Sequence, residues 1–179
     1  MTEQKKQNVA ELFVKCLEEE RVEYVFGLPG EENIDLIEAL SKSKKIRFIL
    51  TRHEQGASFL ADIYGRLTGK AGVCLATLGP GAINLLLGVA DANLDKSPLV
   101  AIVAQASMDR LNKHAHQIID LSELFMPLTK WNALIASPLV VNELIHNGLA
   151  LILALAFRIP YLILRISYKS CRYLSKMKK

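Results

Sequence analysis

The sequence predicts one α/β domain, a parallel sheet flanked by helices on both faces. Short apolar runs alternate with segments that have helical periodicity, which is typical of parallel sheets with right-handed crossovers. The run at residues 99–104 is wholly apolar, as expected for a strand buried on both faces. With 179 residues, of which 51% are hydrophobic, the chain is large enough for one ordinary core.

The first half of the chain contains two helix-strand repeats. A helix is expected over 9–20, because Val9, Leu12, Phe13, Cys16 and Leu17 share one face. The apolar run 24–26 predicts a strand, which the Gly-Leu-Pro-Gly turn at 27–30 ends. A helix over 33–40 and a strand over 46–50 follow.

The next helix is expected over 51–67, where Thr51 and Glu54 fit the S/T-x-x-E capping box and Gly69 marks the end. The remaining elements are strands at 73–77, 99–104 and 131–135, a helix at 81–94, and a helix starting at Ser137-Pro138. Three turns, at 27–30, 51–54 and 77–84, follow strands. Ligands of such sheets bind beyond the carboxyl ends of the strands, so we expect these turns to converge in one crevice.

The charge of the chain is unevenly distributed. Residues 144–179 contain seven basic residues and no acidic ones, and without them 15 basic residues stand against 18 acidic ones. The main body is therefore mildly acidic, unlike a nucleic-acid-binding domain with a basic face. The three cysteines are scattered and odd in number, and the polar N-terminus lacks the apolar core of a signal peptide. A reducing cytoplasm is the default expectation.

Several polar residues could carry chemistry, each with a plainer structural explanation. Glu54 suits the first turn of a helix through capping and the helix dipole. The turns at 27–30 and 78–81 match neither a P-loop nor a dinucleotide fingerprint. His114, His116 and Gln117 lie in a polar stretch without a clustered acidic or cysteine partner, which favours a solvent-facing loop over a metal site.

In combination, these segments resemble the first domain of acetolactate synthase large subunits, which are thiamine diphosphate (ThDP) enzymes. The resemblance covers about residues 8–145. The matching segments, in order, are 25–33, 51–57, 64–70, 76–81, 89–95, 116–117 and 127–132.

The resemblance implies a role for each site residue. Glu54 matches the glutamate that hydrogen-bonds N1′ of the cofactor's aminopyrimidine and serves as its activating acid/base. The positions that line the pyrimidine pocket in that family correspond here to Pro29, Gly30, Pro80 and Asn84. Gln117 matches a glutamine near the reacting end of the cofactor. In that family, two pyruvates give 2-acetolactate and CO₂, in a site shared between two subunits.

The chain also departs from the family. We expect the middle domain and the diphosphate domain, which holds Mg²⁺ in that family, to have no counterpart within residues 1–179, so we assign no metal ligand here. Ile83 and Leu87 replace usual threonines, and Val103-Ala104 replaces Thr-Gly. We therefore divide the chain into a pyrimidine-binding domain at 1–145 and an atypical apolar, then basic, tail at 146–179.

Three interpretations of the tail stay open. The favoured interpretation is a frameshift near residue 147, and the second is an adapted closing strand at 159–166. The third is a membrane segment built on the apolar run 149–157, which ranks last because Arg158 and Pro160 interrupt the apolar stretch. Two functions follow. The chain is either the ThDP-binding part of an acetolactate synthase, acting on pyruvate or another 2-oxoacid as a homodimer or with a separate diphosphate-domain chain, or a non-catalytic remnant or association module.

Overall fold

The computed structural model describes residues 8–111, 115–153 and 162–167. Within them a six-stranded sheet has the order β2-β1-β3-β4-β6-β5, and every neighbouring pair is parallel. The strands are β1 (Tyr24–Gly27), β2 (Arg47–Leu50), β3 (Gly72–Ala76), β4 (Leu99–Gln105), β5 (Trp131–Ile135) and β6 (Leu162–Ser167). The predicted parallel sheet is therefore confirmed.

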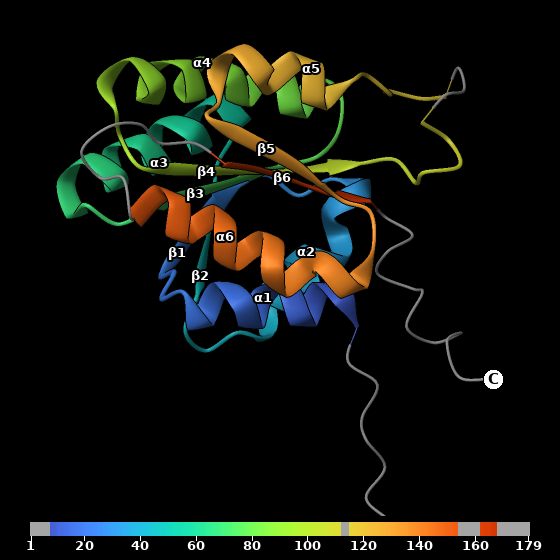
Figure 1. Cartoon of the computed structure of the whole chain (residues 1–179), viewed down its shortest axis with the longest axis horizontal. Helices are drawn as coiled ribbons and strands as arrows, with labels where there is room; N and C mark the ends of the chain where they lie inside the picture. The colour runs from blue at the N-terminus through green and yellow to red at the C-terminus, as the bar shows by residue number, and fades with distance from the viewer. Residues whose placement is uncertain (1–7, 112–114, 154–161, 168–179) are drawn as a thin grey trace, which may run out of the picture.

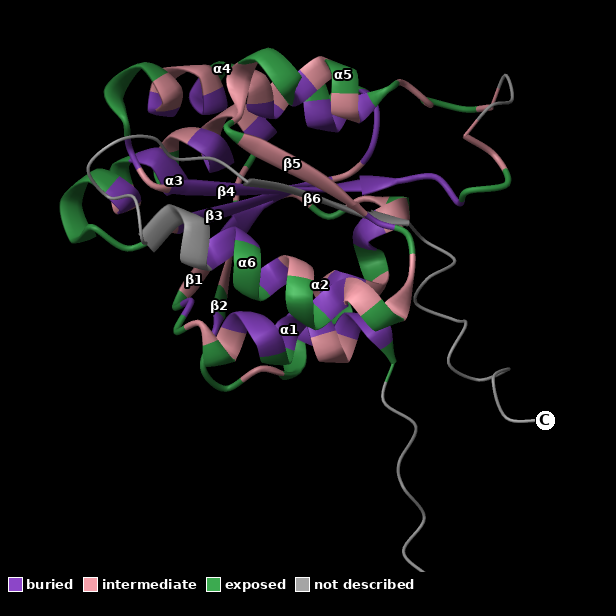
Figure 2. Ribbon diagram, viewed as in Figure 1, coloured by how far each residue is buried: buried purple, intermediate pink, exposed green. Residues whose placement is uncertain are grey.

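Helices cover both faces of the sheet (Figure 1). On one side lie α1 (Val9–Glu19), α2 (Ile34–Lys42) and α6 (Val141–Leu153), and on the other lie α3 (Glu54–Thr68), α4 (Pro80–Asp95) and the short α5 (Leu121–Phe125). Each side has its own apolar core. The strands β3 and β4 are buried along their whole length (Figure 2), and for β4 the apolar run at 99–104 predicts this burial.

The helix starts show where local sequence signals succeed and fail. Ser137 accepts a hydrogen bond from the backbone N–H of Leu139, so the predicted N-cap is confirmed. The capping box predicted for Thr51 is wrong. The helix α3 begins at Glu54, and its N-cap is His53, whose side chain accepts from Gln55 N–H. The Thr51 hydroxyl donates instead to the carbonyl of Gly27 on the neighbouring strand, at 3.3 Å.

Part of the tail belongs to the sheet. Residues Leu162–Ser167 form β6, which inserts between β4 and β5 and pairs with both. For residues 162–166 this agrees with the expected closing strand at 159–166, and Ser167 extends the strand by one residue. The rest of the predicted segment, 159–161, lies outside the described residues. No helix in the described part of the chain is long and apolar enough to cross a membrane.

Candidate functional site

The three strand-ending turns meet at the carboxyl end of the sheet, as predicted. The backbone N–H of Leu28 donates to the carbonyl of Leu75 at 3.3 Å, and Thr51 N–H donates to the carbonyl of Gly27 at 3.0 Å. A Cβ built on Gly30 would lie 2.5 Å from Thr77 Cβ, so the first and third turns are in direct contact. These contacts bring Gly30 and Glu54 to the same corner of the fold.

A buried asparagine shapes the first turn. Asn33 is 3% exposed, and its Oδ1 accepts from Gly30 N–H at 2.8 Å while its Nδ2 donates to the carbonyl of Leu28 at 3.1 Å. Both atoms of the side-chain amide therefore hold the turn that contains Pro29. This role of Asn33 is not among those predicted from the sequence. The available signal was an asparagine three residues after a Pro-Gly turn, where such side chains often bond to nearby backbone.

Glu54 is a buried carboxylate at the start of α3. It is 7% exposed, and its Oε2 accepts a hydrogen bond from Asn84 Nδ2 at 2.9 Å. A Cβ built on Gly81 would lie 3.2 Å from Oε1, so this oxygen faces the first turn of α4. Within the described residues Oε1 has no hydrogen-bond partner. One oxygen of the carboxylate is therefore fixed, and the other remains able to accept a hydrogen bond from a ligand.

The turn before α4 requires a glycine. Gly79 has a φ of +56°, and a Cβ built on it would lie 2.5 Å from the carbonyl oxygen of Gln117. Gln117 itself has a φ of +57°, an uncommon value for a residue other than glycine. Its backbone therefore packs against this turn, while the residue as a whole is exposed.

The other predicted residues lie around the same corner. Pro80 is the first residue of α4 and, like Pro29, is exposed. The structure thus brings together Pro29, Gly30, Glu54, Pro80 and Asn84, with Gln117 approaching through its backbone. No cluster of three potential metal ligands occurs in the described ranges. His114 lies outside those ranges, and His116 is exposed.

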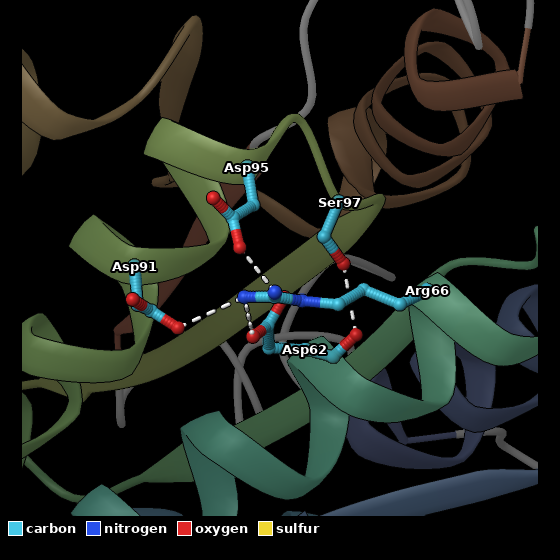
Figure 3. A network of polar contacts seen from close by, with 5 residues as sticks. All are labelled: Asp62, Arg66, Asp91, Asp95 and Ser97. Atoms are coloured by element: carbon cyan, nitrogen blue, oxygen red, sulfur yellow. Dashed lines mark hydrogen bonds and ion pairs between the residues drawn. The ribbon is translucent and has the colours of Figure 1, made fainter.

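An ion-pair network braces α3 against α4 toward the C-terminal ends of the two helices (Figure 3). The Arg66 guanidinium donates to Asp62 at 2.5 Å and to Asp91 at 2.9 Å, and it also contacts Asp95. The hydrogen bond with Asp62 is the main cause that raises the pKa of the Arg66 guanidinium. In addition, Ser97 Oγ donates to the Asp62 carbonyl at 2.8 Å. The brace therefore joins the C-terminal parts of α3 and α4, whereas Glu54 and Asn84 lie toward the N-terminal ends of the same two helices.

Comparison with known proteins places these features in a family. The family model described as "Thiamine pyrophosphate enzyme, N-terminal TPP binding domain" matches residues 7–124. An acetolactate synthase of Mycobacterium avium is 43% identical over 140 residues, covering 76% of this chain and 22% of the relative. The acetolactate synthase large subunit of Corynebacterium glutamicum is 44% identical over 129 residues, covering 72% and 21%.

A plant relative gives the same result. The chloroplastic acetolactate synthase 3 of Brassica napus is 43% identical over 138 residues, covering 75% of this chain and 21% of the relative. The chain therefore spans about a fifth of the length of the curated relatives it matches. The matched part contains the three turns, the buried Glu54 carboxylate and its partner Asn84. The chain therefore belongs to the thiamine pyrophosphate enzyme family, through an N-terminal TPP-binding domain homologous to that of acetolactate synthase.

Proposed function

We propose that this chain supplies the aminopyrimidine-binding half of an acetolactate synthase site, with Glu54 as the cofactor-activating acid/base. The observation that carries the proposal is the Glu54 carboxylate, which is buried, held by Asn84 through Oε2 and open at Oε1. A carboxyl group in this state can share a proton with a ring nitrogen.

The residues around Glu54 fit a flat heterocycle. Gly30 and Gly81 both pack closely against Thr77, which keeps the turn of Gly30 and the first turn of α4 at the same corner. Pro29 and Pro80 add exposed apolar surface at its rim. Bound ThDP would supply a carbanion-forming thiazolium for pyruvate carboligation. The chain's own contribution is to bind the pyrimidine, to orient it through Glu54 and to limit the access of water to that carboxylate.

The rest of the reaction requires groups that the proposal places outside this chain. A diphosphate-binding domain with Mg²⁺ would come from a separate polypeptide or from a longer form of the chain, and the assembly would be at least dimeric. Pyruvate or another 2-oxoacid is the proposed substrate, and the cytoplasm the proposed location. Gln117 would approach the reacting end of the cofactor in that assembly.

The proposal is tested by binding of thiamine, which carries the aminopyrimidine but no diphosphate. We would titrate the ¹⁵N-labelled whole chain and follow the backbone amides of residues 54 and 81–84 by NMR. Glu54→Gln removes a charge-assisted hydrogen bond, so binding should weaken about tenfold or more. Glu31→Gln, a change of the same kind at an exposed residue of the neighbouring turn, is the control. Wild-type affinity in the Glu54 variant would overturn the assignment.

A specific observation favours the second candidate, an association module without turnover. The faces of α3 and α4 expose large apolar side chains, namely Leu60, Ile63, Leu67, Ile83, Leu87 and Leu94. Two of these, Ile83 and Leu87, stand where the family usually has threonine. Sedimentation combined with the thiamine titration separates the candidates, because an association module would self-associate without binding thiamine.

A further inference from the structure

Thr77, which the sequence analysis does not place in the site, lies at its centre. It follows β3 directly, between the turn of Gly30 and the first turn of α4. A Cβ built on Gly30 would lie 2.5 Å from Thr77 Cβ and 2.8 Å from its Cγ2 methyl. A Cβ built on Gly81 would lie 2.9 Å from the same methyl. Both glycines therefore leave the room that this one side chain fills.

The Thr77 side chain has a defined orientation. Its hydroxyl donates to Glu32 Oε2 at 3.4 Å, a long hydrogen bond that directs the polar branch away from α4. A β-branched side chain has few accessible χ1 rotamers, so placing the hydroxyl also places the methyl. The methyl lies on the side of Gly81, where Glu54 Oε1 also lies 3.2 Å from the built Cβ.

We propose that Thr77 is a positioning residue whose methyl group, rather than its hydroxyl, keeps the Glu54 carboxylate in its rotamer beside Asn84. The methyl occupies the space into which the Oε1 side of the carboxylate would otherwise turn, and it keeps water out of that space. The link to cofactor binding rests on the proposed function of Glu54. The placement of the methyl on the side of Gly81 does not depend on it.

Two substitutions separate the methyl from the hydroxyl. Thr77→Val keeps the branched shape and removes the hydroxyl, whereas Thr77→Ser keeps the hydroxyl and removes the methyl. Thr68→Ser makes the same chemical change near the far end of α3, where the residue is exposed, and serves as the matched control. Thermal unfolding of each variant shows whether it remains folded.

The first readout is the side-chain amide cross-peak of Asn84 in the ¹⁵N-labelled chain without ligand, since this amide donates to Glu54. Thr77→Ser should shift this cross-peak, and Thr77→Val and Thr68→Ser should leave it in place. The second readout is thiamine affinity, which should fall about fivefold in Thr77→Ser, as expected for a carboxylate released from its rotamer. In Thr77→Val it should change less than twofold.

The outcomes distinguish this inference from the proposed function. An unmoved Asn84 cross-peak in folded Thr77→Ser, or an equal shift in Thr77→Val, would overturn the role of the methyl. A shift in Thr77→Ser with no thiamine binding by the wild-type chain would uphold the positioning contact and reject the cofactor assignment.

Discussion

The brace between α3 and α4 predicts a measurable loss of stability when Arg66 is replaced. The side chain of Asp62 is 0% exposed, and Arg66 is the charged partner of its carboxylate. Arg66→Met keeps the aliphatic stem and leaves that carboxylate buried without a countercharge. Removing one partner of a buried ion pair costs about 3–5 kcal/mol. Because Arg66 is 32% exposed and water can reach the vacated place, we expect about 2 kcal/mol.

Urea unfolding followed by circular dichroism measures this loss, and the melting temperature should fall by about 4–8 °C. The control is Lys70→Met, which breaks the exposed ion pair with Glu23 and should change the free energy of unfolding much less than Arg66→Met does. The double variant with Asp62→Asn should recover part of the loss, since no charge is then left buried. Equal losses for Arg66→Met and Lys70→Met, or a fully additive double variant, would refute the reasoning.

Three further predictions follow from single contacts. Gly72→Ala should lower the free energy of unfolding in urea by several kcal/mol, because its Cβ would lie 1.9 Å from the carbonyl oxygen of Ala61. Gly56→Ala should instead stabilise α3 by about 0.5 kcal/mol, since there is open space where its Cβ would lie. Burial raises the pKa of the Cys74 thiol above its ordinary 9.0, so just above pH 9 only the unfolded chain ionises this thiol, and the free energy of unfolding falls with rising pH. Cys74→Ala should remove about 1.4 kcal/mol per pH unit from the slope of unfolding free energy against pH. Parallel curves for the wild-type chain and the variant would contradict this. Asn33→Ala should weaken thiamine binding by releasing the turn it holds, and unchanged affinity in a titration followed by NMR would show that the turn does not depend on it.

Features set by local sequence and by sheet geometry were predictable. The run at 99–104 is apolar on both sides, and β4 is buried throughout. The convergence of the turns at 27–30, 51–54 and 77–84 follows from parallel strands, whose carboxyl ends share one edge of the sheet. For the same reason Glu54 and Asn84 meet, although 30 residues separate them in the chain.

Features that depend on a hydrogen bond or a packing contact with a distant part of the chain were not predictable. Thr51 has the sequence spacing of a capping box, but its hydroxyl donates its hydrogen bond to the carbonyl of Gly27, which lies on a strand 24 residues earlier. Thr77 looks like an ordinary end of a strand, and only the fold shows that Gly30 and Gly81 make room for it. In each case the deciding group comes from another element, which a local pattern does not contain.

Strand β6, the part of the tail that lies in the sheet, and the candidate site occupy different parts of that sheet, and this separation decides what β6 can affect. The site is built on β1, β3, α3 and α4, and the residues that form it lie between 28 and 84, with Gln117 approaching from a loop. Strand β6 pairs with β4 and β5 and touches none of the site's strands in the sheet order. Because β5 pairs with β6 and not directly with β4, the tail strand joins β5 to the rest of the sheet. A change in β6 would therefore act first on the stability of the β5 edge, whereas the hydrogen bond between Asn84 and Glu54 joins α3 to α4 directly and involves neither β5 nor β6.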